Sequence, residues 1–201
     1  KSGNVFDRNT LSAVEEMTEA AWQMPYSSRV NSISNFQHTW VNDDDLIVEN
    51  LVQNAANLLD KDLEKIKKIA LSEPELINKL ISNDGDVTGI AIYTMLPGKS
   101  MMEVPEIASF TRNLTEEFKI KYPHIDYYLT GGVMVDNAFG EVGMNDMSTL
   151  IPLMFIGLII FIGISIKSIS GTIGTLIVIL ASMITGLGLA GWFGMVINAA
   201  S

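Results

Sequence analysis

The sequence predicts an α+β domain with a split βαβ, ferredoxin-like arrangement, followed by a two-helix transmembrane hairpin. All 23 Asp and Glu residues and 12 of the 13 Lys and Arg residues precede residue 147, and the remaining cation is Lys167. Two uncharged apolar runs follow this charged part, and within the charged part strand and helix patterns alternate twice. We therefore divide the chain into residues 1–146, outside the membrane, and a membrane segment.

The elements of residues 1–146 follow from apolar spacing and turn residues. Thr10–Gln23 has apolar residues at helical spacing, with Thr10 as the expected N-cap, and Arg29–Trp40 is expected to be extended. Residues 46–52 are expected to form a short strand or the start of a helix. The remaining expected elements are helices over 61–69, 75–81, 103–121 and 133–145 and strands over 87–95 and 125–130. The first strand–helix–strand unit lacks its first strand, so we expect one upstream of Lys1 and a chain that is a fragment.

The last part of the chain is predicted to cross a membrane twice. Residues 147–166 contain no charge and, at about 1.5 Å per residue, span roughly the 30 Å of a hydrocarbon core. Residues 167–171 form the expected turn, and residues 172–197 form the second uncharged run. The alternative is a buried helical hairpin of a large soluble protein, but two adjacent runs of this length favour the membrane. Lys167 favours a cytoplasmic turn, which places residues 1–146 on the outer, periplasmic side.

The second span carries small residues every fourth position. These are Ser182, Gly186, Ala190 and Gly194, and we name them the small-residue ladder. Small residues at this spacing let helix backbones approach closely, so the ladder predicts a tightly packed neighbouring helix. Neither span contains an ionisable residue, and proton relays need such groups at membrane depth. The two spans therefore do not couple transport to a proton gradient by themselves.

Composition and motifs exclude several functions. The net charge of −10 argues against a nucleic-acid partner, and the absence of cysteine excludes disulfides and thiolate metal sites. Adjacent Asp43, Asp44 and Asp45 lack the spacing of a calcium loop, and His38 and His124 stand apart from each other. Nucleophile and phosphate-loop motifs are also missing. The sequence predicts no metal, no cofactor and no enzyme.

Methionines and aromatic residues form the candidate site for a hydrophobic ligand. Flexible thioethers and aromatic rings suit a surface that accepts varied apolar molecules. The alternative interpretation, ordinary core packing with chance exposure, is the favoured one of the two. The candidate contacts are Trp22, Met24, Phe36, Trp40, Met95, Met101 and Met102.

The order of several motifs resembles one porter domain of the resistance-nodulation-division (RND) transporter superfamily, in its MMPL-like, hydrophobe-exporting branch. The resemblance covers nearly the whole chain, and it depends on order and spacing because none of the motifs is diagnostic alone. The motifs are Val5-Phe6 before the first helix, Arg29–Ile33, the acidic turn 42–47, Leu80–Gly85, Tyr128–Gly132, and a helix through Asp146 into a membrane span.

The resemblance implies a function and a location. It implies that the chain is a porter domain followed by the second and third membrane helices of a multi-pass protein. That protein would lie in the bacterial inner membrane and export lipids or other hydrophobic molecules, driven by a proton gradient. Its relay residues would lie on helices outside this chain. The expected partners are membrane lipids, the hydrophobic substrate, and other helices of the transporter, partner subunits or copies of the chain. The alternatives are a membrane-anchored lipid- or sterol-binding or sensor subunit and, more weakly, a SecD/SecF-like translocation accessory.

Overall fold

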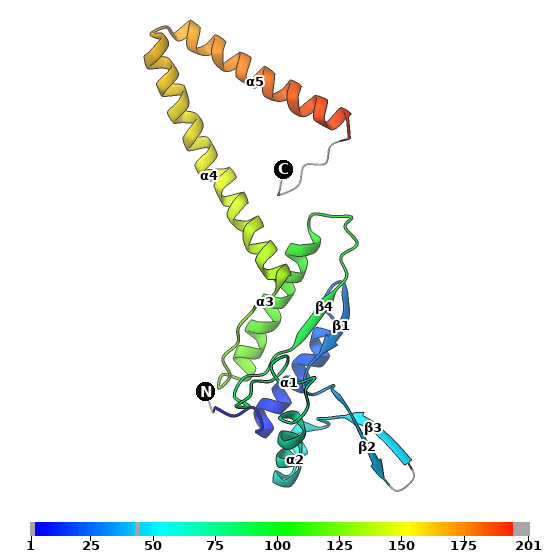
Figure 1. Cartoon of the computed structure of the whole chain (residues 1–201). Helices are drawn as coiled ribbons and strands as arrows, with labels where there is room; N and C mark the ends of the chain where they lie inside the picture. Colours follow the sequence, from blue (N-terminus) through cyan, green and yellow to red (C-terminus); the bar gives the residue numbers. More distant parts are fainter. Residues whose placement is uncertain (1–2, 43–44, 195–201) are drawn as a thin grey trace. The chain divides into compact units, whose positions relative to one another are not determined.

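Ten helices and strands follow one another along the described part of the chain (Figure 1). The computed structural model describes residues 3–42 and 45–194. The chain forms two compact units, which divide after Val135, so the predicted boundary at Asp146 lies inside a helix. In order, the elements are α1 (Arg8–Ala21), β1 (Ser27–Asn31), β2 (Gln37–Asn42), β3 (Asp45–Asn50), the 3-10 helix η1 (Ala55–Asn57), α2 (Asp60–Ala70), β4 (Ala91–Thr94), α3 (Glu103–Lys121), α4 (Gly132–Ile166) and α5 (Ile169–Trp192).

The starts of α1 and α2 involve carboxylates, whereas the sequence suggested the Thr10 hydroxyl as the cap of the first helix. Asp7, and not Thr10, caps α1: its Oδ1 accepts a hydrogen bond from the Thr10 backbone N–H at 2.9 Å. In α2 the Asp62 carboxylate accepts the backbone N–H of Leu59 at 3.1 Å. Acidic residues in the first turn of α2 and lysines in its last turn also complement the helix dipole.

The strands form two separate antiparallel pairs. Strand β1 pairs with β4, with Val30 opposite Ile92, and β2 pairs with β3, with Trp40 opposite Ile47. The α+β class is therefore confirmed. The described strands do not form the four-stranded sheet of a ferredoxin-like domain, because each sheet has two strands.

Two predicted elements are absent from the described residues. Residues 75–81 form turns and isolated bridges instead of a helix, since Asn78 has a φ of +59° and a helix needs a negative φ throughout. Residues 125–130 belong to no strand. A strand is held by hydrogen bonds to a neighbour, and this segment has no paired strand beside it.

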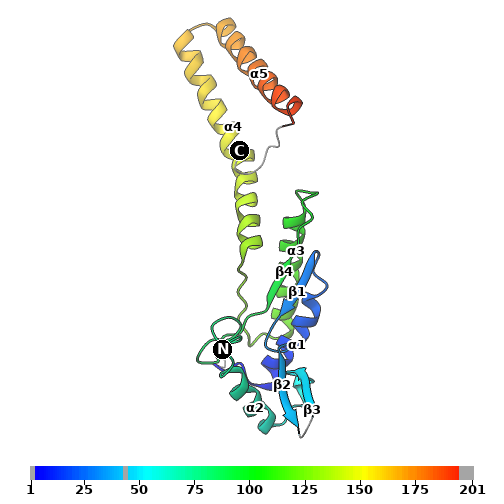
Figure 2. The same cartoon turned by 45° about the vertical axis from the view of Figure 1, so that its right-hand side comes forward.

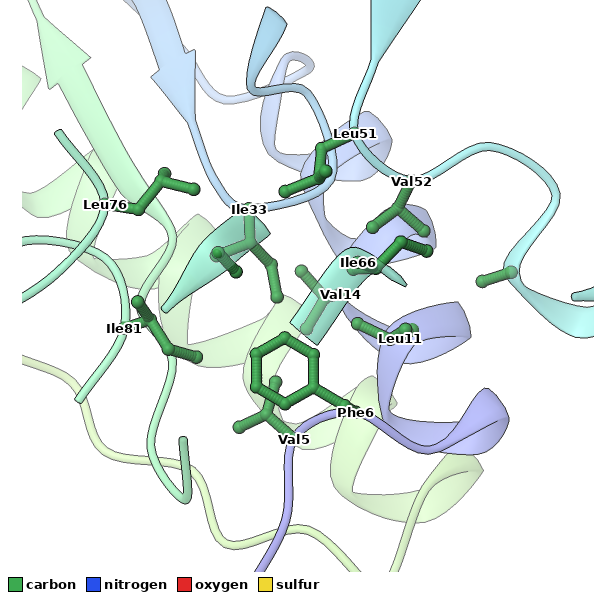
Figure 3. Close-up of a cluster of buried hydrophobic side chains, with 12 residues drawn as sticks. Val5, Phe6, Leu11, Val14, Ile33, Leu51, Val52, Ile66, Leu76 and Ile81 are labelled. Carbon is green, nitrogen blue, oxygen red and sulfur yellow. The ribbon is translucent and has the colours of Figure 1, made fainter. Parts of the chain in front are cut away.

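The core of the first unit lies between α1, α2 and the chain on either side of the β2–β3 hairpin (Figure 3). Leu11 of α1, Ile33 after β1 and Leu76 after α2 are fully enclosed, and Phe6 packs beside them. Burying side chains of this size stabilises the fold by about 1.5–3 kcal/mol each. This cluster joins segments that are far apart in the sequence.

The second unit contains most of α4 and all of α5. Helix α4 runs without a break for 35 residues, as predicted from the pattern that continues through Asp146, and α5 has 24 residues. Only Lys167 and Ser168 separate the two helices, so the connection is shorter than the predicted 167–171. The Ser168 hydroxyl accepts the Gly171 backbone N–H and caps α5.

Candidate functional site

An apolar groove lies in the first unit. It encloses about 670 Å³. Four parts of the chain line it: α1, the residues that lead into and form β4, α3, and the segment that follows α3. The lining from the last two parts includes Ile107, Thr111, Leu114, Thr115 and residues 125–134.

The floor of the groove is made by helices. Val14 of α1, Met24 after α1, and Ile107 and Leu114 of α3 line it and are each less than 10% exposed. Helices α1 and α3 also contact each other directly. The floor is therefore apolar and well packed, and it suits a hydrocarbon-like surface on whatever occupies the groove.

The two walls are backbone edges. One wall is β4, whose Ile92 and Thr94 line the groove while its other edge pairs with β1. The opposite wall is the segment Tyr127–Thr130. In Figure 2 this segment passes on the side of β4 that faces away from β1. The groove therefore lies beside a free strand edge.

One polar group at the groove lacks a partner. The Tyr127 hydroxyl is buried and makes no hydrogen bond within the described structure, and burial raises the pKa of this hydroxyl. A buried hydroxyl without a partner is costly, by about 1–3 kcal/mol. The neighbouring His124 also has a buried, unpaired Nε2. Of the two residues, only Tyr127 lines the groove, so its hydroxyl is the group there that lacks a hydrogen-bonding partner.

The predicted ligand contacts are dispersed, and only Met24 lines the groove. Phe36 packs against the hydrophobic core, and Trp40 of β2 lies beneath the Lys65 ammonium, whose Nζ is 4.9 Å from the ring centre. Trp22 is half exposed at the end of α1. The structure therefore does not bring these four side chains into one site.

The other three predicted contacts surround the loop between β4 and α3. Met95, Met101 and Met102 are exposed, by 74%, 88% and 58%. Glu103 holds this loop in place, because its buried carboxylate accepts the backbone N–H groups of Gly98, Lys99 and Ser100 at 2.7–3.0 Å. Burial would raise the pKa of Glu103, but these three N–H donors outweigh it and lower the pKa. The methionines thus flank an exposed loop that three hydrogen bonds join to Glu103.

The small-residue ladder keeps three of its four members on one helix. Ser182, Gly186 and Ala190 lie in α5. Gly194 lies beyond the end of α5 with a φ of +70°, so it does not continue the helical face. A Cβ at Gly186 would meet no atom of the described residues within 4 Å.

Sequence reasoning missed the groove because its walls come from segments without a fixed pattern. The signal was the apolar alternation of Ile125, Tyr127 and Leu129, which resembles a strand, next to the strand pattern that ends at Met95. We expected both as strands but did not infer that they would enclose a groove.

The described residues contain no group of three His, Asp or Glu side chains that could hold a metal ion. The groove combines a mostly apolar lining with the polar residues Lys79, Thr111, Asp126 and Tyr127. A concave, mostly apolar lining with a few polar groups is typical of ligand-binding sites. Comparisons with protein-family models, curated proteins and solved structures found no match to this chain.

Proposed function

We propose that this chain is part of an RND-type membrane transporter that exports lipids or other hydrophobic molecules. Proton coupling would come from helices outside this chain. The observation that carries the proposal is the pair of long apolar helices that follows the α+β unit: the apolar windows of α4 and α5 are not buried by the described protein.

Apolar helices that the rest of the protein does not cover need surroundings other than water. Apolar surface costs about 25 cal/mol per Å² when it is left in water, so two such helices are stable only if lipid or other helices cover them. A multi-pass protein of the bacterial inner membrane satisfies this requirement. The charge pattern supports an outer, periplasmic position for the first unit, since Lys167 is the cation beside the connection between the helices.

The order of elements supports the porter-domain part of the proposal. Helix α1 precedes β1, and β4 precedes α3, with β1 and β4 adjacent and antiparallel. In a ferredoxin-like domain, with the order β-α-β-β-α-β, the first helix likewise precedes one middle strand and the second helix follows the other. The motifs from Val5-Phe6 to Asp146 occur in the order that the RND resemblance requires.

A membrane-anchored lipid-binding or sensor subunit is the second candidate. The observation that favours it is the absence of ionisable residues from 147–166 and 169–192, because such spans anchor a domain but move no proton. A SecD/SecF-like translocation accessory is a weaker third candidate, supported by the same order of domain and spans.

Dye efflux from cells tests the proposal. We would delete the complete reading frame that encodes this chain, load cells with Nile red, and follow its retention with and without an uncoupler of the proton gradient. A proton-driven exporter predicts several-fold higher retention in the deletion strain. The uncoupler should raise retention in the parent strain to the same level, and the restored reading frame should reverse the deletion.

The other outcomes separate the candidates. An anchored binder predicts unchanged retention but saturable Nile red binding by the purified chain in detergent. Unchanged retention without such binding contradicts both the exporter and the binder. If Nile red retention rises on deletion but the uncoupler does not change retention in the parent strain, proton coupling is contradicted.

A further inference from the structure

One end of the first unit carries large apolar side chains that the described chain leaves exposed. This end contains the loop between β4 and α3 and the turn between α1 and β1, which meet where the Met95 backbone N–H donates to the Tyr26 carbonyl at 2.9 Å. Its apolar members are 40–88% exposed, and neighbouring exposed residues of this kind mark a contact surface. We call this surface the methionine tip and define it as Trp22, Met95, Leu96, Met101 and Met102.

Hydrogen bonds join the loop of the methionine tip to α3. The Glu103 carboxylate accepts the backbone N–H groups of residues 98–100 at 2.7–3.0 Å. Beside it, the Tyr26 hydroxyl donates to the Glu106 carboxylate at 2.9 Å, which joins the turn before β1 to the same helix. These contacts hold the loop in the conformation that exposes its methionines, so the fold presents these side chains and does not cover them.

The methionine tip differs in charge from the rest of the acidic unit. Residues 1–146 hold all 23 acidic residues of the chain, yet residues 91–102 contain a single charged residue, Lys99. Tryptophan and lysine are both favoured where a protein meets the headgroups of a bilayer, and a lysine is attracted to anionic lipids. Flexible methionines adapt to an irregular apolar surface. The composition of the tip therefore suits the boundary between lipid and water.

The chain leaves the first unit at the end that bears the methionine tip. Helix α3 starts at Glu103, beside the tip, and the segment after α3 runs back along this helix in both views (Figures 1 and 2). The first unit ends at Val135, and 11 residues separate Val135 from the uncharged run 147–166. As a helix these residues span about 17 Å. The tip therefore lies at the end of the unit that the chain tethers closely to a bilayer.

We propose that the methionine tip is a membrane-contact surface. Met95, Met101 and Met102 enter the headgroup region of the bilayer beside the spans, and Lys99 faces the lipid phosphates. The occupant is the lipid surface and not a single captured molecule, because these methionines are exposed and lie outside the groove lining. This inference depends on the membrane insertion of α4 and α5 in the proposed function, and it does not depend on transport.

A fluorescent label that responds to lipid tests the proposal. We would attach the fluorophore NBD to single cysteines in the full chain, reconstituted in vesicles of equal parts phosphatidylcholine and phosphatidylglycerol. The variants are Met101→Cys in the tip, Ile120→Cys as its matched control, and Ile160→Cys in α4 as the reporter of insertion. Met101 and Ile120 are similarly exposed, by 88% and 82%. Ile120 lies near the other end of α3, about 26 Å along the helix from Glu103.

The vesicles carry a nitroxide quencher either near the lipid headgroup or deep in the acyl chain. The shallow nitroxide should remove most of the emission at Met101→Cys and leave Ile120→Cys unchanged, and the deep nitroxide should quench Ile160→Cys. Quenching of Ile160→Cys without Met101→Cys overturns the membrane contact and leaves insertion intact. If Ile160→Cys is not quenched, membrane insertion is contradicted, and this inference fails with it.

Two further outcomes also overturn the inference. Equal quenching at Met101→Cys and Ile120→Cys means that the unit does not contact lipid through the tip. Blue-shifted emission at Met101→Cys that neither nitroxide quenches means that protein, such as a second copy of this chain, covers the tip.

Charge reversal tests the place of Lys99 at the lipid phosphates. In the Met101→Cys chain, Lys99→Glu should reduce quenching by the shallow nitroxide about twofold or more in these anionic vesicles, because it replaces attraction to the headgroups by repulsion. Lys61→Glu, at an exposed lysine of α2, should leave quenching unchanged. Equal quenching in the two variants would overturn the placement of Lys99 at the bilayer surface.

Discussion

At Gly85 an added methyl group would meet both backbone strain and a close contact. Its φ is +69°, and a Cβ there would lie 2.9 Å from Cε2 of the buried Phe6 ring. Its carbonyl also accepts the backbone N–H of Val5. An L-residue in this left-handed conformation costs roughly 1–2 kcal/mol before any steric clash is counted.

We expect Gly85→Ala to lower the free energy of unfolding by about 2–4 kcal/mol, because the backbone strain and the contact with Phe6 add. Gly98→Ala is the matched control: its φ is +67°, but a Cβ there meets no atom within 4 Å. Urea unfolding of the full chain in detergent, followed by tryptophan fluorescence, measures both. Equal losses in the two variants would show that Phe6 moves aside without cost.

Glu103 makes the loop before α3 sensitive to acid. Its pKa is lowered from the ordinary value of 4.5, because its carboxylate accepts three backbone N–H bonds in spite of its burial. A group whose pKa is lower in the folded state stabilises the fold when it is ionised. This contribution is present above pH 4.5 and is lost as the pH falls through the lowered pKa.

Glu103→Gln should therefore destabilise the chain at pH 7 and reduce the difference in stability between pH 7 and acid. Unfolding midpoints between pH 7 and pH 3 measure this, with Glu117→Gln on an exposed position of α3 as the control. Protease cleavage at Lys99 reports the loop itself and should become faster in Glu103→Gln. A variant with the acid sensitivity of the unmodified chain would contradict the role of this carboxylate.

At the scale of elements, helices with long periodic patterns were predicted correctly, but the pairing of strands was not. The predicted helix over 103–121 matches α3, and the helix that continues into the membrane segment matches α4, because helical hydrogen bonds lie within one segment. Strand pairing depends on a distant partner. Arg29–Trp40 therefore split into β1 and β2 in different sheets, and 125–130 had the composition of a strand but no neighbour to pair with.

Helix α5 offers a clean test of the small-residue ladder. Among residues 3–42 and 45–194, no atom lies within 4 Å of a Cβ placed at Gly186, and the same is true of Gly188, which lies on another side of α5. A β-carbon at either position therefore has open space within the described residues. We expect a difference between leucine variants at the two positions to come from a neighbouring helix.

We expect Gly186→Leu to weaken assembly in detergent by about tenfold, since close helix contacts in membranes contribute roughly 1–2 kcal/mol. Gly188→Leu should leave assembly unchanged. Cross-linking across a dilution series in detergent measures both. Equal assembly of the two variants would exclude the face of Ser182, Gly186 and Ala190 as the packing surface.

For the whole molecule, the sequence predicted the division into a charged part and an apolar part better than it predicted the site. Charge and apolar content are properties of each segment alone, so the contrast on either side of residue 147 is visible without a structure. The groove instead arises where α1, β4, α3 and the segment after α3 meet. Met24, Met95 and Met101 were all candidate contacts by composition. Only the tertiary structure shows that Met24 is buried whereas Met95 and Met101 are exposed.

The chain contains no cysteine, so single introduced thiols can report on which side of a membrane each part lies. We expect Ser72→Cys, in the first unit, to react with a membrane-impermeant maleimide in intact spheroplasts. Ser170→Cys, at the start of α5, should react only after the membrane is made permeable, because Lys167 favours retention of this connection on the cytoplasmic side. Labelling of both thiols in intact spheroplasts would contradict a cytoplasmic connection. Recovery of both variants in the soluble fraction would contradict membrane insertion, and α4 and α5 would then require a protein partner to cover their apolar surfaces.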